Sequence, residues 1–276
     1  MEHFLEDDFT HVIQKAFRGM NIPPSEAALR AGISKNDILS FTRGTFSATT
    51  ARRLAPILGL NAKALASYQI YRPKRVELKE IKRLDLPFGS DRVNAWLIST
   101  SDTAILFDTG YDMTSCSIAV DSFGGPKIDR VFVTHNHHDH IGGISSFTVR
   151  GNILHGANID HTLPMVLGES MSFGLLMVRA CDLSGHAIPA LGFHVGGLTL
   201  PVLVTGDALF AGSIGGCATP TSYQHALKRL QDVLAPLPDS TILLPGHGPA
   251  TTLGEERMSN PFLSQEYTQR PYLRSR

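Results

Sequence analysis

Hydrophobic residues recur at helical spacing over the first seventy residues of the chain. The first run consists of Phe9, Val12, Ile13, Ala16 and Phe17, which would share one face of a helix. Further helices are predicted over residues 26–30, 35–43, 49–58 and 62–68, with Ser34 as an N-cap and Gly44 and Gly59 as stop signals. This part of the chain is predicted to form a small all-helical domain.

From Tyr71 onward the pattern becomes that of strands with helices between them. Alternating or continuously apolar stretches predict strands over residues 76–88, 93–99, 103–107, 130–133, 152–155, 175–180, 191–195, 198–204 and 241–244. Helical spacing returns at residues 222–234. Strands with interspersed helices, and loops rich in Gly and His, predict an α/β sandwich. We place the boundary near Arg72-Pro73, so that residues 1–72 and 73–276 form two domains.

Composition and charge agree with two modules of a soluble protein. The chain of 276 residues is 42% hydrophobic and 18% charged, as in ordinary globular proteins. Residues 1–76 contain eleven Lys or Arg and six Asp or Glu, whereas the remainder contains fourteen and nineteen. No apolar run approaches the roughly 20 residues that span a bilayer, the N-terminal sequence is too acidic for a signal peptide, and three cysteines are too few for a disulfide framework. We expect a reduced, cytoplasmic protein without a membrane partner.

The strongest chemical signal is a cluster of imidazole and carboxylate groups after the strand that ends at Val133. The segment 134–143 reads THNHHDHIGG, so one strand-to-helix turn would carry His135, His137, Asp139 and His140. These groups suit Zn²⁺ and similar divalent ions. A purely structural role is disfavoured, because buried polar groups are costly when they lack partners. The sequence therefore predicts a metal site at this turn.

The cluster resembles the HxHxDH signature of the metallo-β-lactamase superfamily, and further motifs of that family follow in order. They are Ser184-Gly185-His186, Thr205-Gly206-Asp207 and Leu244-Pro245-Gly246-His247, with Asn94 and Phe107-Asp108-Thr109-Gly110 upstream. The resemblance covers about residues 76–265. It implies the αββα sandwich of that family, here with a helical domain in front of it.

The resemblance also implies two metal sites and their ligands. The first would consist of His135, His137 and His186, the second of Asp139, His140 and His247, and Asp207 would bridge both. The ions would be two divalent cations, Zn²⁺ first and Fe or Mn as alternatives, and a hydroxide held between them would be the nucleophile. Catalysis would rest on His135, His137, Asp139 and His140, with Asp139 also accepting a proton. Asp108 would orient a ligand histidine.

Two further segments resemble the glyoxalase II (hydroxyacylglutathione hydrolase-like) group, which cleaves thioesters. They are residues 209–215 and 254–263. Where that group commonly has Arg-Thr-Asp, this chain has Gly216-Cys217-Ala218, so an arginine that could pair with a substrate carboxylate is missing. We expect a dinuclear hydrolase of a small thioester or ester. A lactonase and a persulfide dioxygenase with one iron stay open as alternatives.

The helical domain resembles a Cro/repressor-type helix-turn-helix over residues 25–60. The resemblance implies that the helix 35–43 would enter the major groove, with Ser34, Lys35, Asn36 and Thr42 placed to contact DNA. The positive charge has the sign for phosphate binding, but it is spread out, and Asp37 lies on the same helix. Three roles stay open: DNA binding by a regulator whose metal domain senses a ligand, homodimerisation, and a lid over the hydrolase.

Overall fold

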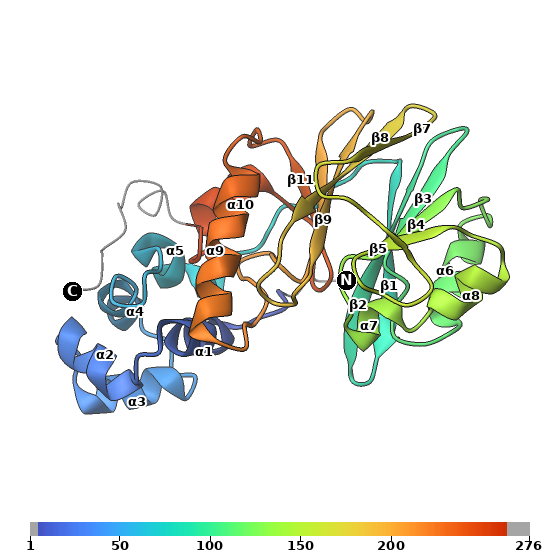
Figure 1. The fold of residues 1–276 in the computed structure, drawn as a ribbon. Coiled ribbons are helices and arrows are strands. Elements are labelled where there is room, and N and C mark those ends of the chain that lie inside the picture. Colours follow the sequence, from blue (N-terminus) through green and yellow to red (C-terminus); the bar gives the residue numbers. More distant parts are fainter. Residues whose placement is uncertain (1–4, 264–276) are drawn as a thin grey trace.

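The αββα sandwich is confirmed by a computed structural model that describes residues 5–263 (Figure 1). Over these residues the chain forms two six-stranded sheets, which face each other. Their orders are β1-β2-β3-β4-β5-β6 and β12-β11-β10-β9-β8-β7. A helical region precedes the sandwich and lies at one side of it.

Each sheet is built from a continuous part of the chain. The first contains β1 (Ile81–Phe88), β2 (Asp91–Ser99), β3 (Ala104–Phe107), β4 (Arg130–Phe132), β5 (Leu154–Gly156) and β6 (Leu163–Pro164). The second contains β7 (Ser170–Phe173), β8 (Leu176–Asp182), β9 (Leu191–Gly196), β10 (Val202–Gly206), β11 (Ile242–Pro245) and β12 (Thr251–Thr252). β3 to β6 run parallel, as do β10 and β11. The carboxyl ends of β4, β8, β10 and β11 lead into the loops that carry the predicted metal ligands.

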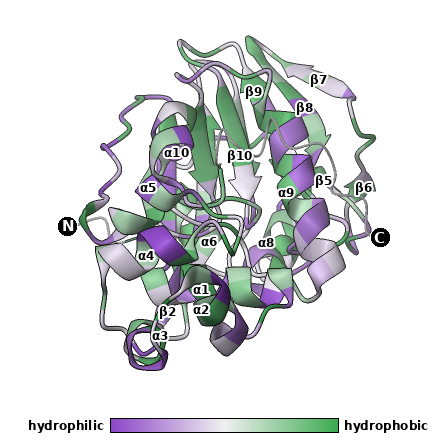
Figure 2. Cartoon of the chain, turned by 90° about the vertical axis from the view of Figure 1, so that its left-hand side faces the viewer, coloured by the Kyte–Doolittle hydropathy of each residue, from purple (hydrophilic) through white to green (hydrophobic). Residues whose placement is uncertain are grey.

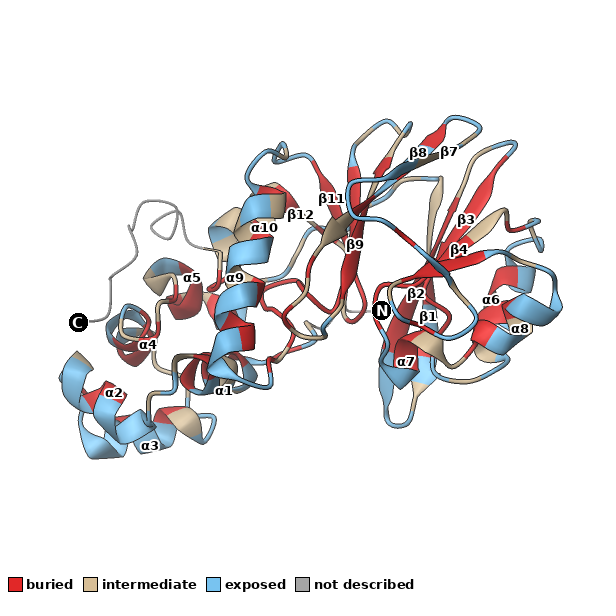
Figure 3. Cartoon of the chain, in the orientation of Figure 1, coloured by how far each residue is buried: buried red, intermediate tan, exposed pale blue. Residues whose placement is uncertain are grey.

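Alternation along the central strands sorts their side chains into separate core layers. In β3, Ile105 and Phe107 belong to the layer between the sheets, whereas Leu106 packs with α6 (Ser115–Ser122) and α8 (Ile144–Val149). In β11, Leu244 belongs to the layer between the sheets and Leu243 to the layer around α9 (Pro220–Leu234). Because both faces are covered, these strands are apolar throughout, and Figure 3 shows them buried.

The helical region contains the helices that the sequence predicted. They are α1 (Phe9–Met20), α2 (Pro24–Ala31), α3 (Lys35–Thr42), α4 (Ala48–Leu54) and α5 (Ala62–Ala66), followed by a 3-10 turn, η1 (Tyr68–Ile70). The predicted apolar face of α1 is buried, and Ser34 caps α3 by accepting from the Asp37 amide at 3.1 Å. The predicted helix 49–58 is too long. It ends at Leu54, shortly before Pro56, which has no amide hydrogen to continue it.

The helical region is packed onto α9 through one continuous apolar cluster. Phe9, Val12 and Phe17 of α1 share this cluster with Tyr223 and Leu230 of α9. Gly19 lies so close that a β-carbon there would be 2.2 Å from the Tyr223 ring. Figure 2 looks onto this side, where α1 to α5 and α9 stand in front of β9 and β10. The division at residue 72 stays a prediction, but a shared core joins its two sides.

Two predicted strands begin later than expected. The apolar stretch 76–88 pairs only from Ile81, because residues 79–80 form a turn in which Ile81 donates to the Leu78 carbonyl at 3.1 Å. The stretch 198–204 pairs only from Val202, directly after Pro201. The remaining helices are α7 (His138–Ile141) and α10 (Leu253–Ser259). No helix among the described residues combines the length and apolar character needed to cross a membrane.

Candidate metal centre

The seven predicted metal ligands meet at one edge of the sandwich, on four loops that follow strands. They form two groups that could hold metal ions: His135, His137, His186 and Asp207, and Asp139, His140, Asp207 and His247. Within each group all ligand atoms lie within 4.8 Å of one another. The structure therefore brings together the residues that the sequence singled out, in the same two sets.

Asp207 belongs to both groups and lies between them. Its Oδ1 is 3.3 Å from Nε2 of His140, and its Oδ2 is 3.5 Å from Nε2 of both His186 and His247. The residue is only 7% exposed. This position is the one that a bridging carboxylate would need.

The imidazoles are held so that most of them turn Nε2 toward the centre. Nδ1 of His186 donates to the Gly216 carbonyl at 2.7 Å, and Nδ1 of His247 donates to the Arg92 carbonyl at 2.8 Å. Since a carbonyl can only accept, these bonds place a ring hydrogen on Nδ1 and turn Nε2, the nitrogen that could bind a cation, toward the centre. His137 is the exception. It presents Nδ1, which lies 3.0 Å from Nε2 of His135 and of His186.

Asp108 contacts two of these imidazoles through their Nδ1 side, His140 directly and His135 through the Thr134 hydroxyl. Its Oδ2 lies 2.9 Å from Nδ1 of His140 and accepts from the Thr134 hydroxyl at 2.9 Å. The oxygen of that hydroxyl in turn lies 3.0 Å from Nδ1 of His135. Asp108 has a left-handed backbone (φ 60°), a conformation in which Asp is enriched. Its carboxylate thus reaches both His140 and the start of the 134–140 turn, as an orienting residue would.

Burial and the central carboxylates determine which imidazoles are protonated on both nitrogens and therefore positively charged. Burial opposes the charge of His140, but the carboxylates of Asp207 and Asp108 outweigh it and raise its pKa to about 10. Burial also opposes the charge of His247, yet Asp139 and Asp207 raise its pKa to about 11. The positive charges of these two protonated rings balance the negative charges of two buried carboxylates. A divalent cation could replace those protons, because metal binding displaces protons from its ligands.

Several features show that the residues present fit divalent ions. Nε2 of His140 and Oδ1 of Asp207 are buried and lie 3.3 Å apart, but they form no hydrogen bond with each other or with another described residue, although such atoms rarely stay unpaired. A β-carbon at Gly246 would lie 2.2 Å from Asp207 Oδ1 and 2.6 Å from His140 Cε1, so the glycine keeps the space beside both atoms open. Imidazole and carboxylate donors suit Zn²⁺, Fe²⁺ and Mn²⁺.

No sequence pattern predicted that the N-terminal segment lies beside this centre. The carboxylate of Glu6 is 4.0 Å from Nδ1 of His247. Lys15 of α1 donates to the Ile214 carbonyl at 2.8 Å, two residues before the carbonyl that holds His186. These contacts depend on how α1 packs against the sandwich, and no local motif predicts them.

Other residues named from the sequence lie outside the two ligand groups. His138 is exposed, and its ring meets that of Tyr111 edge-on at 4.8 Å. On α3 and its cap, Ser34, Lys35 and Asn36 are exposed, whereas the Thr42 hydroxyl donates to the Ile38 carbonyl at 2.9 Å. Contact of these four residues with DNA stays a prediction.

Sequence comparisons agree with this arrangement. The model of the metallo-beta-lactamase superfamily matches residues 89–177. The hydroxyacylglutathione hydrolase GloC of Haemophilus influenzae is 30% identical over 164 residues, which is 49% of this chain and 76% of that protein. The probable metallo-hydrolase YqgX of Bacillus subtilis is 24% identical over 208 residues, which is 65% of this chain and 96% of that protein.

Solved structures share the fold. A metallo-beta-lactamase from Staphylococcus aureus superposes with a TM-score of 0.58 at 22% identity, over 70% of this chain and 67% of that one. The protein TTHA1623, solved in a di-iron-bound form, gives a TM-score of 0.52 at 27% identity, over 65% of this chain and 99% of that one. With the two ligand groups in place, these similarities show that the chain belongs to the metallo-β-lactamase superfamily.

Proposed function

We propose that this protein is a dinuclear metal-dependent hydrolase of a small thioester or ester, with Zn²⁺ as its ions. The observation that carries the proposal is the position of Asp207, which lies between two groups that each contain three further ligands. The thioester part is supported by the similarity to GloC, whose name describes a hydrolase of hydroxyacylglutathione.

Each ligand group would hold one of the two ions. His135, His137 and His186 would hold one ion, Asp139, His140 and His247 the other, and Asp207 both. When bound, such ions polarise a carbonyl and lower the pKa of a bound water to near 7.

Asp139 is placed to move a proton during the reaction. Its Oδ2 lies 3.1 Å from Nε2 of His247, whereas its Oδ1 has no hydrogen-bond partner among the described residues. Burial alone would raise the pKa of this carboxyl, but the bond from His247 and the nearby His140 lower it below its usual range. Asp139 is therefore ionised at neutral pH and can accept a proton.

The residues after Gly215 bear on the kind of thioester. The stretch Gly216-Cys217-Ala218 offers no cation for an anionic substrate group, and Gly216 instead holds His186 through its carbonyl. We therefore propose a small acyl thioester that needs no carboxylate clamp at this place, in preference to a glutathione conjugate.

A combined metal and substrate analysis of the purified full-length chain tests this proposal. We expect two divalent ions per chain and hydrolysis of short acyl thioesters, which EDTA abolishes and added Zn²⁺ restores, because the ions supply the nucleophile. Lactones, phosphodiesters and a glutathione thioester serve as comparison substrates. Preferential lactone cleavage would contradict the substrate class. One iron per chain together with oxygen consumption on a persulfide would replace the hydrolase with a dioxygenase.

A further inference from the structure

The segment before α1 is wedged between the helical region and the His247 loop. The Tyr68 hydroxyl donates to the Asp7 carbonyl at 3.0 Å, and this contact is buried. On the other side, a β-carbon at Gly248 would lie 3.2 Å from the backbone nitrogen of Glu6. The segment therefore has contacts with both parts of the chain, next to a predicted ligand.

Lys15 and Asp7 form an ion pair at the junction between α1 and the sandwich. Their side chains are 19% and 9% exposed, and the Lys15 ammonium also donates to the Ile214 carbonyl at 2.8 Å. A largely buried ion pair adds little net stability, because removing both charges from water is costly. The pair therefore matters more for the position of the groups that it contacts than for the stability of the fold.

The loop that Lys15 contacts lies directly on two predicted ligands. A β-carbon at Gly215 would be 1.9 Å from the Asp207 carbonyl oxygen and 2.8 Å from Cγ of His186. The next carbonyl, that of Gly216, accepts from Nδ1 of His186 at 2.7 Å. A small shift of this loop would therefore rotate or release the His186 ring.

We propose that Lys15 is a positioning residue of the metal centre, which acts with Asp7 to hold the Ile214 carbonyl and thereby the Gly216 carbonyl against His186. This inference rests on the proposed metal-dependent function. It makes the helical region a component of the centre.

Cobalt titration of the metal-free full-length protein tests this role through visible absorption, without any assay of activity. Lys15→Met is expected to weaken one of the two Co²⁺ binding steps about tenfold and to change its absorption spectrum, since outer partners of ligands contribute about 10–100-fold to metal affinity. Lys15→Arg, which keeps the charge, should restore most of the affinity. Arg18→Met, an exposed position on the same helix, is the matched control and should titrate like the wild type.

The outcomes separate this inference from the proposed function. Two Co²⁺ ions bound equally well by the wild type and Lys15→Met, with the same spectrum, would overturn the role of Lys15 and leave the metal centre standing. Failure of the wild type to bind Co²⁺ would instead overturn the centre itself. If Lys15→Met does not fold, as judged by thermal unfolding of the metal-free protein, Asp7→Asn replaces it, and unchanged titration of that variant would equally overturn the inference.

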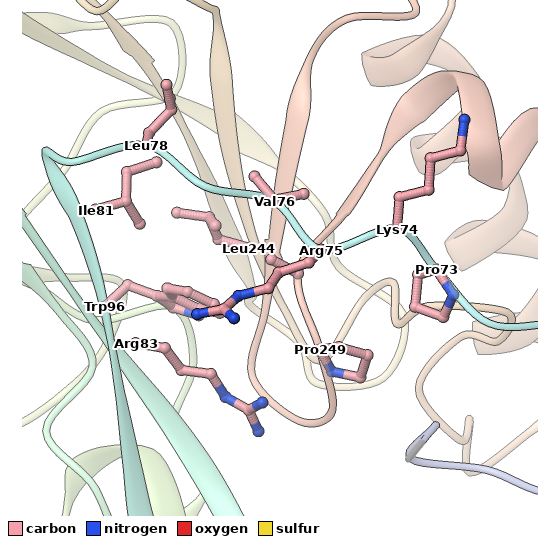
Figure 4. Close-up of a pocket in the computed structure, with 11 residues that line it drawn as sticks. Pro73, Lys74, Arg75, Val76, Leu78, Ile81, Arg83, Trp96, Leu244 and Pro249 are labelled. Atoms are coloured by element: carbon pink, nitrogen blue, oxygen red, sulfur yellow. The ribbon is translucent and has the colours of Figure 1, made fainter. Parts of the chain in front are cut away.

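A separate cavity of about 180 Å³ lies between the linker after η1 and the edge of the sandwich (Figure 4). Its apolar lining consists of the partly exposed Val76, Leu78 and Ile81 and the buried Trp96 and Leu244. Its cations are Lys74, Arg75 and Arg83, and no Asp or Glu lines it. Arg83 donates through Nε to Asn94 at 2.7 Å. Figure 4 shows both arginines and Trp96 among the residues that line the cavity.

The two guanidinium groups keep donors free for a ligand. Among the described residues, the only partner of Arg75 is Glu77, 2.9 Å from its Nε, so that both Nη atoms lack one. Nη1 of Arg83 also has no partner in this part of the chain. Guanidinium groups bind carboxylates with two parallel hydrogen bonds, and the partly exposed Val76, Leu78 and Ile81 offer apolar contacts to a ring.

We infer that this cavity binds a small aromatic carboxylate, with its ring against Val76, Leu78 and Ile81 and its charge on Arg75 and Arg83. Because Trp96 is the only tryptophan of the chain, its fluorescence reports on the cavity directly. Titration with benzoate is expected to quench it saturably, and Arg75→Gln should weaken binding at least about fivefold through the lost charge-assisted bonds. Arg72→Gln, outside the lining, is the matched control. A change that does not saturate, equal binding by Arg75→Gln, or equal quenching by neutral benzamide would overturn the inference.

Discussion

Replacement of Asp207 by alanine is expected to abolish hydrolysis and to leave fewer than two ions bound per chain. Its two carboxylate oxygens lie 3.3–3.5 Å from the Nε2 atoms of His140, His186 and His247, so one substitution removes a ligand from both groups. Metal ions contribute several kcal/mol of transition-state stabilisation. We therefore expect kcat/KM on a short acyl thioester to fall about a thousandfold or more.

Metal quantification beside the rate measurement shows whether the loss has this cause. Asp207→Asn keeps the shape of the side chain but not its charge and should bind metal weakly as well. Asp232→Ala, on the surface of α9 where Asp232 pairs with Lys228, controls for the general effect of losing a carboxylate and should stay active. An Asp207→Ala variant that binds two ions and hydrolyses thioesters would contradict the assignment of Asp207 as the bridge.

The candidate ligands could be picked out from the sequence because each belongs to a short motif at the end of a strand. Four of them lie within the six residues 135–140, and His186, Asp207 and His247 each follow a glycine in a recognisable context. Strand positions such as 104–107 were predictable for a related reason, since burial on both faces leaves a continuous apolar run. Most residues of the candidate centre could therefore be recognised from local sequence patterns alone.

What the sequence did not predict depends on packing between distant segments. Lys15 and Ile214 are 199 residues apart. Lys15 belongs to no motif, and the segment 209–215 that contains Ile214 gives no sign of a contact with α1. β6 and β12 have only two residues each, too few for a periodic pattern. The apolar residues Val76 and Leu78 looked like part of a strand, but they line the cavity beside Trp96.

The helix-turn-helix resemblance and the shared core concern different faces of the helical region. α1 is packed against α9, whereas α2 and α3 lie at the end away from the sheets (Figure 1). Lys35 and Asn36 on α3 are exposed. A contact of α3 with DNA would thus leave the α1 contact intact, and we keep DNA binding as a separate proposal. Band shifts with promoter DNA, compared with the Lys35→Ala and Arg43→Ala double variant, would test it.

Replacement of Gly246 by alanine is expected to prevent binding of the ion at Asp139, His140 and His247. The added methyl carbon would lie 2.2 Å from Asp207 Oδ1 and 2.6 Å from His140 Cε1, closer than non-bonded atoms approach. Either carboxylate or imidazole must move, and both are predicted ligands. We expect Co²⁺ titration to show loss of at least one binding step and activity to fall to near the level of Asp207→Ala.

Gly196→Ala is the matched control for this steric effect. A β-carbon at Gly196, the last residue of β9, would meet only Met177, at 3.7 Å from Cε and 4.0 Å from its carbonyl oxygen, which are ordinary contacts. The control should therefore retain both ions and most activity, which separates obstruction of the site from a general cost of replacing glycine by alanine. If Gly246→Ala bound two ions like the control, the space beside Asp207 and His140 could not be where a cation sits, and the location of the centre would have to be revised.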